Sequence, residues 1–300
     1  MAFRNLIQAL PNLDIKENWP LAPLCTLRTG GEAEFFVAPD SIESMKNLYA
    51  LALKENYPLY ILGGGSNVLF PDGLVKGIFI STLNLNSLEW RTNLTVDVDA
   101  GFKLSTLLKE IRERGLAGLE FAAGIPGTLG GALSGNAGAG DHGVCELVDY
   151  VICLLPDGEI RTLNHDEISY GYRRSSLAEG KKIILSARMT FRQATPKDKD
   201  VLENFLLRRG SQPHGLHNAG CTFKNPPGNF SAGKLLDDSG CKNLCVGDAV
   251  VSDVHANFIL NRGHAASADV LKLIELCAER VYERTGIKLE PEIKIFCKES

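Results

Sequence analysis

Apolar residues recur with helical spacing in three segments of the chain. The first segment begins at Asp40, which we expect to cap the first turn, and runs to about Asn56. The second covers about residues 104–114, and the third begins near Ser267. In each segment, apolar side chains three or four positions apart form one stripe, which predicts three amphipathic helices.

Short apolar runs between these helices indicate strands. One continuous run ends at a glycine cluster at residue 63, as is typical of a buried strand, whereas residues 94–98 alternate apolar and polar side chains. A Pro156-Asp157-Gly158 turn separates two further runs. The predicted strands cover about residues 57–62, 75–80, 94–98, 148–155, 183–191 and 292–296.

A polar segment from Gln193 to Asp200 interrupts this pattern, and we predict that it is a linker. A basic helix around Arg208 and Arg209 then opens a second unit. Helices and strands are mixed on both sides of the linker. The pattern therefore predicts an α+β fold with two units and a boundary near residue 195.

Composition and charge are those of an ordinary globular protein. The 300 residues are 44% hydrophobic and 23% charged, so the chain can bury a sizeable core. A net charge of −4 provides no broad basic surface, and nucleic acid is not an expected partner. The N-terminus lacks the apolar core of a signal peptide, and no run of roughly 18 apolar residues is present. We expect a cytoplasmic protein with no membrane partner.

Eight cysteines are scattered along the chain. The closest pair, Cys241 and Cys245, has no second pair and no nearby histidine cluster, so no metal site is expected. Most of the cysteines are predicted to be small buried hydrophobic residues, and Cys221 is set apart as a candidate reactive thiol. The eight are Cys25, Cys145, Cys153, Cys221, Cys241, Cys245, Cys277 and Cys297.

Two glycine-rich segments are the first candidates for chemistry. Glycine tolerates positive φ, so successive backbone N–H groups can turn toward one anion. The first segment, Gly63–Asn67, is also compatible with a plain strand-to-loop turn, and it lacks the Gly-Lys-Ser/Thr ending of a Walker loop. The second, the loop Gly124–Gly140, has seven glycines and no charge, a composition typical of backbone pressed against a ligand or another backbone. Two such loops suggest a ligand with two phosphates.

These segments and several later blocks resemble the UDP-N-acetylenolpyruvoylglucosamine reductase family. The similar blocks occur in order from Thr26 to about Ile295 and cover nearly the whole chain. They are Thr26–Gly31, Leu62–Leu69, Gly124–Ala132, Asn136–Gly138, Ser169–Ser175, Asn218–Pro226, Ala232–Asp237, Val251–Phe258 and Leu289–Ile293. The resemblance implies an FAD-binding domain of the vanillyl-alcohol-oxidase/PCMH type, with lobes at residues 1–85 and 86–194, followed by an α+β substrate domain at residues 195–300.

The resemblance also implies an enzyme of peptidoglycan precursor synthesis. In such an enzyme NADPH reduces noncovalently bound FAD, and flavin N5 passes hydride to UDP-N-acetylglucosamine-enolpyruvate, which becomes UDP-N-acetylmuramate. Negative charge then spreads onto the substrate carboxylate, and the adjacent carbon needs a proton. The resemblance further implies a monomer of the compact subclass, without a tyrosine-bearing loop insertion.

Three residues match the family's catalytic positions. Arg173 is the implied enolate-stabilising cation, with the adjacent Arg174 as its competitor, and Glu292 would stabilise the same charge, with Glu290 as its competitor. Cys221 stands where many members carry serine as the proton donor. A thiol with an ordinary pKa of about 8.5 is more acidic than an alcohol and is still mainly protonated at neutral pH. Surface ion pairs and a small buried cysteine remain the structural alternatives.

Further ligand contacts are carried over from the same blocks. The implied cofactor-binding residues are Arg28, Gly63, Gly64, Gly65, Ser66, Asn67, Gly124, Ile125, Pro126, Gly127, Thr128, Gly130, Gly131, Ser134, Asn136 and Ala137. The implied substrate-binding residues are Tyr172, Arg209, Gln212, Lys224, Asn225 and Asn257.

Two other functions remain open. Another FAD-dependent oxidoreductase of the same fold, acting on a hydroxy acid or a sugar, would keep the glycine loops without needing the blocks around Cys221 and Glu292. A flavin- or nucleotide-binding protein without catalysis would hold its ligand and show no substrate-dependent turnover.

Overall fold

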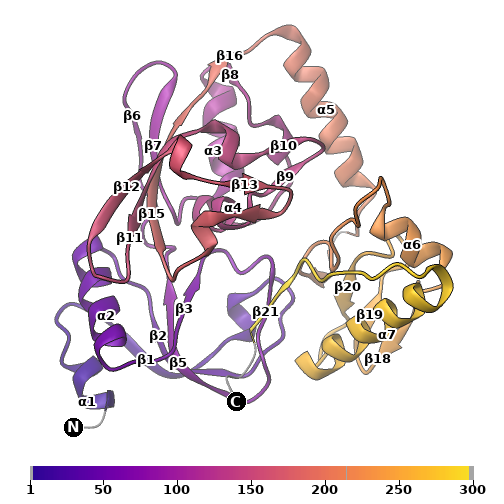
Figure 1. Cartoon of the computed structure of the whole chain (residues 1–300), viewed down its shortest axis with the longest axis horizontal. Helices are drawn as coiled ribbons and strands as arrows, with labels where there is room; N and C mark the ends of the chain where they lie inside the picture. The colour runs from indigo at the N-terminus through magenta and orange to yellow at the C-terminus, as the bar shows by residue number, and fades with distance from the viewer. Residues whose placement is uncertain (1–2, 214, 297–300) are drawn as a thin grey trace. The chain divides into compact units, whose positions relative to one another are not determined.

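The computed structural model describes residues 3–213 and 215–296, and these form two compact units. Unit 1 contains the described residues up to Glu17, together with Phe35–Gly64 and Gly77–Leu207. Unit 2 contains Asn18–Glu34, Gly65–Lys76 and the described residues from Arg208 onward. Figure 1 shows helices and strands in both units, as an α+β fold requires.

In unit 1, strand β3 (Leu59–Leu62) leads directly into the first glycine segment. It is the edge strand of a sheet with the order β1-β2-β5-β3 and pairs in parallel with β5 (Leu74–Ser81), Leu62 lying opposite Ser81. Only Leu62 of β3 is buried. The prediction of a buried strand was therefore wrong in this respect, because an edge strand has a neighbour on one side only.

Helix α2 (Ile42–Lys54) confirms the first predicted helix but not its predicted cap. Ser41 has an extended backbone and its side chain accepts a hydrogen bond from the N–H of Ser44. An N-cap side chain reaches the N–H groups two or three positions ahead, so the cap is Ser41 and not Asp40.

A five-stranded antiparallel sheet forms the other half of unit 1, in the order β12-β11-β15-β7-β6. The three predicted strands in this region are confirmed, but β6 and β12 were missed. β6 has only 3 residues, and the two apolar residues of β12, Ile160 and Leu163, are three positions apart and do not alternate as in a half-buried strand. The strands are β6 (Leu88–Trp90), β7 (Thr95–Asp99), β11 (Val148–Leu154), β12 (Ile160–Asn164) and β15 (Ile183–Thr190).

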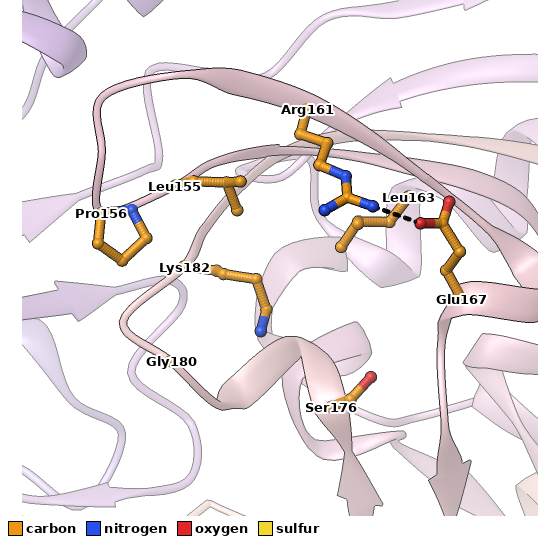
Figure 2. A pocket seen from close by; sticks show the side chains of 8 residues that line it. All are labelled: Leu155, Pro156, Arg161, Leu163, Glu167, Ser176, Gly180 and Lys182. Atoms are coloured by element: carbon orange, nitrogen blue, oxygen red, sulfur yellow. Dashed lines mark hydrogen bonds and ion pairs between the residues drawn. The ribbon is translucent and has the colours of Figure 1, made fainter.

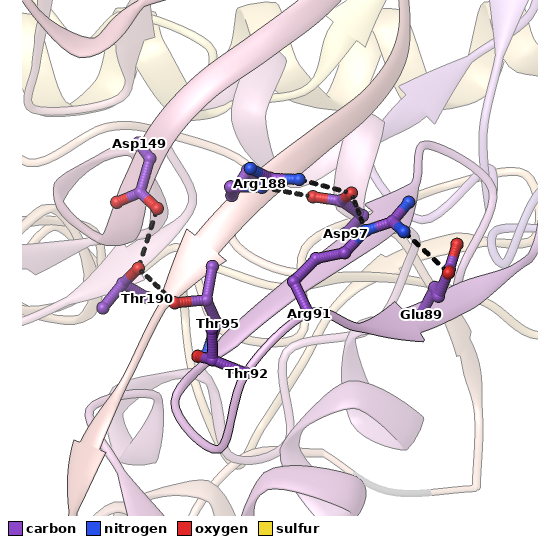
Figure 3. Close-up of polar contacts among 8 residues, drawn as sticks. All are labelled: Glu89, Arg91, Thr92, Thr95, Asp97, Asp149, Arg188 and Thr190. Carbon is purple, nitrogen blue, oxygen red and sulfur yellow. Dashed lines mark hydrogen bonds and ion pairs between the residues drawn. The ribbon is translucent and has the colours of Figure 1, made fainter.

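The two faces of this sheet follow the alternation of its residues. Val96 and Val98 are buried in the core, whereas Asp97 between them lies on the polar face. There Asp97 accepts hydrogen bonds from Nε of Arg188 at 2.7 Å and Nε of Arg91 at 2.6 Å (Figure 3). These two guanidinium groups lower the pKa of the Asp97 carboxyl, so the carboxylate is stabilised on this face.

The predicted loop Gly124–Gly140 contains a helix, α4 (Leu129–Gly135), so the prediction of a continuous loop was wrong. Leu129, Ala132 and Leu133 recur with helical spacing and are buried in the core. Each glycine inside a helix costs about 1 kcal/mol relative to alanine, and this apolar stripe offsets the cost by packing against β7 and β15.

The predicted linker also differs from the structure. Residues 196–200 form the first turns of α5 (Pro196–Gly210), which includes the predicted basic helix around Arg208. Proline fits the first turn of a helix, and the carboxylate of Asp198 accepts a hydrogen bond from the N–H of Thr195 at 2.7 Å. The segment is polar because α5 is mostly exposed, with only Asp198 and Leu202 buried.

Unit 2 contains a four-stranded sheet in the order β17-β20-β19-β18, and a parallel pair of β4 with β21. The predicted last helix is confirmed as α7, whereas the predicted strand at 292–296 has two paired residues only. The elements are β4 (Val68–Leu69), β17 (His217–Asn218), α6 (Ala232–Asp238), β18 (Cys245–Val246), β19 (Ala249–Val251), β20 (Ile259–Asn261), α7 (Ser267–Thr285) and β21 (Lys294–Ile295).

The second predicted helix is confirmed as α3, and short elements complete the fold. They are α1 (Phe3–Gln8), β1 (Ile15–Pro20), η1 (Ala22–Leu24), β2 (Glu32–Val37), α3 (Leu104–Glu113), β8 (Leu116–Ala117), η2 (Glu120–Ala122), β9 (Gly138–Ala139), β10 (His142–Gly143), η3 (Val144–Leu147), η4 (His165–Glu167), β13 (Tyr170–Gly171), β14 (Arg174–Ser175), η5 (Ser176–Ala178) and β16 (Arg192–Gln193). Among the described residues, no helix combines the length and hydropathy needed to cross a membrane.

Candidate active site

The two glycine segments meet within unit 1. A Cβ atom at Gly63 would lie 2.5 Å from Oγ1 of Thr128, and a Cβ atom at Gly64 would lie 2.8 Å from Cα of Gly127. No side chain fits at such distances, so only glycine permits the approach. Segments that are far apart in the sequence therefore present one backbone surface.

Thr128 gives this surface an unsatisfied polar group. The residue is 2% exposed, and its Oγ1 makes no hydrogen bond to any part of the chain that the structure describes. A buried hydroxyl without a partner is costly, by about 1–3 kcal/mol. A ligand oxygen held against Gly63 and Gly64 would satisfy it, so the surface fits a phosphate-bearing cofactor.

The rest of the first glycine segment belongs to unit 2. Gly65 has a φ of +62°, and a Cβ atom there would overlap the carbonyl oxygen of Leu24. Asn67 donates a hydrogen bond from Nδ2 to the carbonyl oxygen of Glu292 at 3.1 Å. Asn67, a predicted cofactor-binding residue, thus holds the backbone of Glu292, a candidate catalytic residue.

Arg28 lies in a strained turn of unit 2. Its φ is +58°, a region that non-glycine residues seldom adopt, and its exposed side chain donates from Nη1 to the carbonyl of Pro23 at 2.8 Å. The turn is held by Asn261, whose Nδ2 donates to the carbonyls of Leu27 and Arg28 at 3.0 and 3.2 Å. We missed Asn261 from the sequence, where its only signal is a polar residue at the end of an apolar run.

Arg173 lies in the tight turn of the hairpin formed by β13 and β14 in unit 1. Its φ is +53°, and its Nη1 donates to the carbonyl of Gly138 at 2.9 Å. The guanidinium also lies over the ring of Tyr172, 5.2 Å from its centroid, and that tyrosine is 54% exposed. Arg174, its competitor, is exposed, whereas Arg173 is partly buried.

Asn136 connects this hairpin to the second glycine segment. It ends α4 in the left-handed conformation and is 7% exposed. Its Nδ2 donates to the carbonyl of Gly171 at 3.0 Å, and its Oδ1 accepts from the N–H of Cys145 at 3.1 Å. The amide of this predicted cofactor residue is therefore engaged in holding the Arg173 turn.

In unit 2, Cys221 and Glu292 lie on neighbouring antiparallel segments. The N–H of Glu292 donates to the carbonyl of Thr222 at 2.7 Å, and Phe223 pairs with Pro291 in an antiparallel bridge. Cys221 is partly exposed and lies against an apolar cluster of Val250, Phe258 and Leu260. The two predicted catalytic residues of this unit are thus brought onto adjacent backbone segments.

The competitor of Glu292 has another partner. Glu290 forms an ion pair with Lys224 at 3.5 Å, and its side chain is 77% exposed. Such surface pairs contribute about 0–1 kcal/mol, and they leave the carboxylate solvated. Glu292 is only partly exposed, which favours it for a role that depends on partial burial.

The other predicted substrate residues have local partners. Arg209 donates from Nη1 to Oε1 of Gln212 at 2.9 Å, so these two residues are brought together. Oδ1 of Asn225 accepts from the N–H of Ala232 at the start of α6. Asn257 is buried and hydrogen-bonds to Thr222 and Phe223, the two residues that follow Cys221. The remaining predicted cofactor residues are partly or fully exposed along the glycine segments: Ser66, Gly124, Ile125, Pro126, Gly130, Gly131, Ser134 and Ala137.

The cysteine predictions are confirmed for most of the described thiols. Cys25, Cys145, Cys153, Cys241 and Cys277 are buried, Cys245 is exposed, and Cys297 lies outside the described residues. Burial raises the pKa of Cys145 and of Cys153 to about 11, so both thiols stay protonated and unreactive at neutral pH. Within the residues that the structure describes, no group of three or more His, Cys, Asp or Glu could hold a metal ion.

A pocket of about 380 Å³ in unit 1 contains none of the predicted residues. Figure 2 shows Arg161 paired with Glu167 at 2.7 Å on one wall and Lys182 across from it. The Arg161 side chain is 58% exposed, so the pair is well solvated. The glycine surface and the Cys221 segment, not this pocket, carry the candidate chemistry.

Two family models and many named relatives match the chain. Residues 212–296 match the UDP-N-acetylenolpyruvoylglucosamine reductase C-terminal domain, and residues 33–164 match an FAD binding domain. The chain is 40% identical to the UDP-N-acetylenolpyruvoylglucosamine reductase of Chlamydia felis, over 92% of each chain. It is 38% identical to that of Clostridioides difficile, over 97% of this chain and 96% of the relative.

Solved structures show the same relationship. The crystal structure of UDP-N-acetylenolpyruvylglucosamine reductase from Thermus caldophilus is 32% identical, with a TM-score of 0.81 over 95% of this chain and 99% of that one. Physcomitrella patens BBE-like 1, 17% identical over 64% of this chain and 45% of its own, has a TM-score of 0.50 and shares the fold alone. The α+β fold with an FAD-binding region is confirmed. The chain belongs to the UDP-N-acetylenolpyruvoylglucosamine reductase family.

Proposed function

We propose that this chain is an NADPH-dependent UDP-N-acetylmuramate dehydrogenase that reduces UDP-N-acetylglucosamine-enolpyruvate. The observation that supports it most is the pairing of the Cys221 and Glu292 segments in unit 2, because hydroxy-acid and sugar oxidases of this fold do not need that pair. We further infer a monomeric, cytoplasmic enzyme. Residues 1–85 and 86–194 would supply the FAD-binding lobes, and residues 195–300 would supply most of the substrate domain, which Asn18–Glu34 and Gly65–Lys76 complete as parts of unit 2.

The glycine segments would hold noncovalently bound FAD. Gly63, Gly64 and Gly127 offer backbone without side chains, and the Thr128 hydroxyl is available to a phosphate oxygen. When bound, FAD supplies hydride transfer from NADPH to the enolpyruvyl group. The protein's own residues must then stabilise the charge that develops on the substrate and deliver a proton.

Arg173 and Glu292 have the charge-stabilising role. When hydride adds to the vinyl carbon, the electron pair of the C=C bond moves toward the carboxylate of the substrate and forms an enolate-like species. The permanently charged guanidinium of Arg173 can bind that carboxylate with two hydrogen bonds, which a lysine would not reproduce. Glu292 in its protonated form can donate a further hydrogen bond to the same group.

Cys221 has the proton-donating role. Its Sγ–H bond breaks as a C–H bond forms at the carbon adjacent to the carboxylate, and the resulting thiolate regains a proton from water. Hydride and proton together saturate the C=C bond, so the reaction balances. A partly exposed thiol can exchange with solvent, as this cycle requires.

The two half-reactions of the holoenzyme, followed anaerobically by flavin absorbance, test this proposal. NADPH should bleach the wild-type flavin, and the enolpyruvyl substrate should recolour it. Cys221→Ser should keep appreciable reoxidation, because a hydroxyl can also donate a proton, whereas Cys221→Ala should be reduced normally and reoxidised at least 100-fold more slowly. If the substrate fails to recolour the reduced wild-type enzyme, the proposed activity is wrong. Unchanged half-reactions in Cys221→Ala would remove Cys221 from the mechanism.

A further inference from the structure

Asn257 lies in unit 2, in the turn between β19 and β20, and is 3% exposed. It makes three hydrogen bonds to two successive residues of the Cys221 segment. Its carbonyl accepts from the N–H of Thr222, its Oδ1 accepts from the N–H of Phe223, and its Nδ2 donates to the carbonyl of Phe223, each at 2.8 Å.

The side-chain amide of Asn257 takes the place of the backbone peptide group of a neighbouring strand. It provides both a donor and an acceptor to Phe223, as a neighbouring strand would. The other edge of the same segment is held by the N–H of Glu292 on the carbonyl of Thr222 at 2.7 Å. Two sets of hydrogen bonds therefore fix the backbone immediately after Cys221.

The loop that carries Asn257 is itself tied down. The N–H of Asn257 donates to Nδ1 of His255 at 3.2 Å, and the N–H of His255 donates to Oγ of Ser252 at 3.3 Å. The His255 ring also meets Phe258 edge-on, with centroids 5.0 Å apart. The amide of Asn257 is thus held in one orientation before any ligand binds.

We propose that Asn257 is a positioning residue for proton delivery rather than a substrate contact: it fixes the register of Cys221 against Glu292. The inference rests on the proposed function. Phe223, two positions after Cys221, bonds to both the Oδ1 and the Nδ2 of the buried Asn257 amide, and we call these two hydrogen bonds the Asn257 clamp. Because both polar atoms of the amide are engaged in this way, the amide holds backbone and does not contact substrate. A misplacement of about 1 Å at a reacting group can cost about 100-fold in rate, so the clamp has a measurable effect on the chemical step.

Asn257→Ala in the holoenzyme is the first test. Reduction by NADPH and the KM for the enolpyruvyl substrate should change by less than about twofold, whereas reoxidation of the flavin by substrate should slow by at least tenfold. The matched control is Val281→Ala, which removes buried methyl groups from α7 and lowers stability without touching the clamp. Reoxidation slowed equally in both variants, or a raised KM with unchanged kcat, would overturn the inference.

Asn257→Asp distinguishes the loss of these two hydrogen bonds from a general loss of stability. The ionised carboxylate can accept from the Phe223 N–H but repels its carbonyl, whereas the protonated acid can donate to it and restore both hydrogen bonds. Burial raises the pKa of such a carboxyl. The ratio of the reoxidation rate of this variant to the wild-type rate should therefore increase on the order of tenfold as pH falls from 8 to 5, and should approach one. A ratio independent of pH contradicts the clamp.

Alkylation of Cys221 by iodoacetamide adds a readout that needs no substrate. Peptide mass spectrometry should show a Cys221 rate in Asn257→Ala that differs from wild type by more than about threefold, while the exposed Cys245 keeps its rate. Equal Cys221 rates in the two proteins would contradict the clamp. The two proposals fail separately, since reoxidation of the wild-type enzyme tests the function and the variant-to-wild-type ratio tests the positioning role.

Discussion

At the residue scale, the candidate site depends on hydrogen bonds between residues that are far apart in the sequence. The motif favoured Arg173 over Arg174 and Glu292 over Glu290, and these remain predictions. In the structure Arg173 donates to the carbonyl of Gly138, and Glu290 is paired with Lys224. Asn257, by contrast, resembled a ligand contact in the sequence. Its partner Phe223 is 34 positions away, and spacing along a chain carries no information about such tertiary hydrogen bonds.

Gly64→Ala should weaken FAD binding by at least tenfold. The added Cβ would lie 2.8 Å from Cα of Gly127, so one of the two backbones must shift and the surface offered to the cofactor is disturbed. Flavin release measured by fluorescence during dilution reports the affinity. Gly210→Ala is the control, because apart from its chain neighbours and the backbone of its own helix nothing lies within 4 Å of its Cβ position, and it should keep wild-type affinity. Unchanged flavin binding in Gly64→Ala would show that this contact does not shape the cofactor site.

At the element scale, apolar periodicity predicted α2, α3 and α7 because each buries one stripe. It failed for β12 and for the start of α5, which are largely exposed and are held by polar contacts instead. At the start of α5, Asp198 accepts hydrogen bonds from Arg192 and from the N–H of Thr195, in the manner of a capping box. A polar helix of this kind has the composition of a linker, and only its capping pattern distinguishes the two.

Asp198→Asn should destabilise the protein by about 1 kcal/mol at pH 7, since it weakens this cap. The hydrogen bonds from Arg192 and Thr195 hold the pKa of Asp198 well below the usual carboxyl range. Because the folded-state pKa is lowered, this stabilisation is fully present above the unfolded pKa of about 3.9 and is lost as pH falls through the folded value. Thermal melts at pH 7 and below pH 4 should show the gap between variant and wild type narrowing in acid. A gap that widens in acid would contradict the assignment.

At the scale of the whole molecule, both units are discontinuous in sequence. Unit 2 takes Asn18–Glu34 and Gly65–Lys76 from the N-terminal part of the chain, although the polar segment near residue 195 suggested a simple division. Sequence reasoning identified where composition changes, but it could not identify which early segments fold with the later ones. That information lies in pairings such as β4 with β21, which join residues more than 200 positions apart.

A fragment of residues 195–300 should therefore fail to fold by itself. In unit 2 the carboxylate of Asp72 accepts hydrogen bonds from the N–H groups of Ser267 and Ala268 at 3.0 and 2.9 Å, which caps the start of α7. The fragment lacks Asp72, it lacks β4 as the partner of β21, and the Nδ2 of Asn261 loses the Leu27 carbonyl. The hydrogen bond of Asn261 is buried, so its loss leaves a polar group unsatisfied at a cost of about 1–3 kcal/mol, in a chain whose total stability would be 5–15 kcal/mol at most. The bonds from Asp72 are part-buried and exposed, and their loss removes the cap of α7. Circular dichroism and amide NMR of the fragment should show no cooperative melting and little dispersion, whereas full-length Asp72→Ala should still melt cooperatively at a lower temperature. A fragment that melts cooperatively with dispersed amide signals would instead support an independent domain beginning near residue 195.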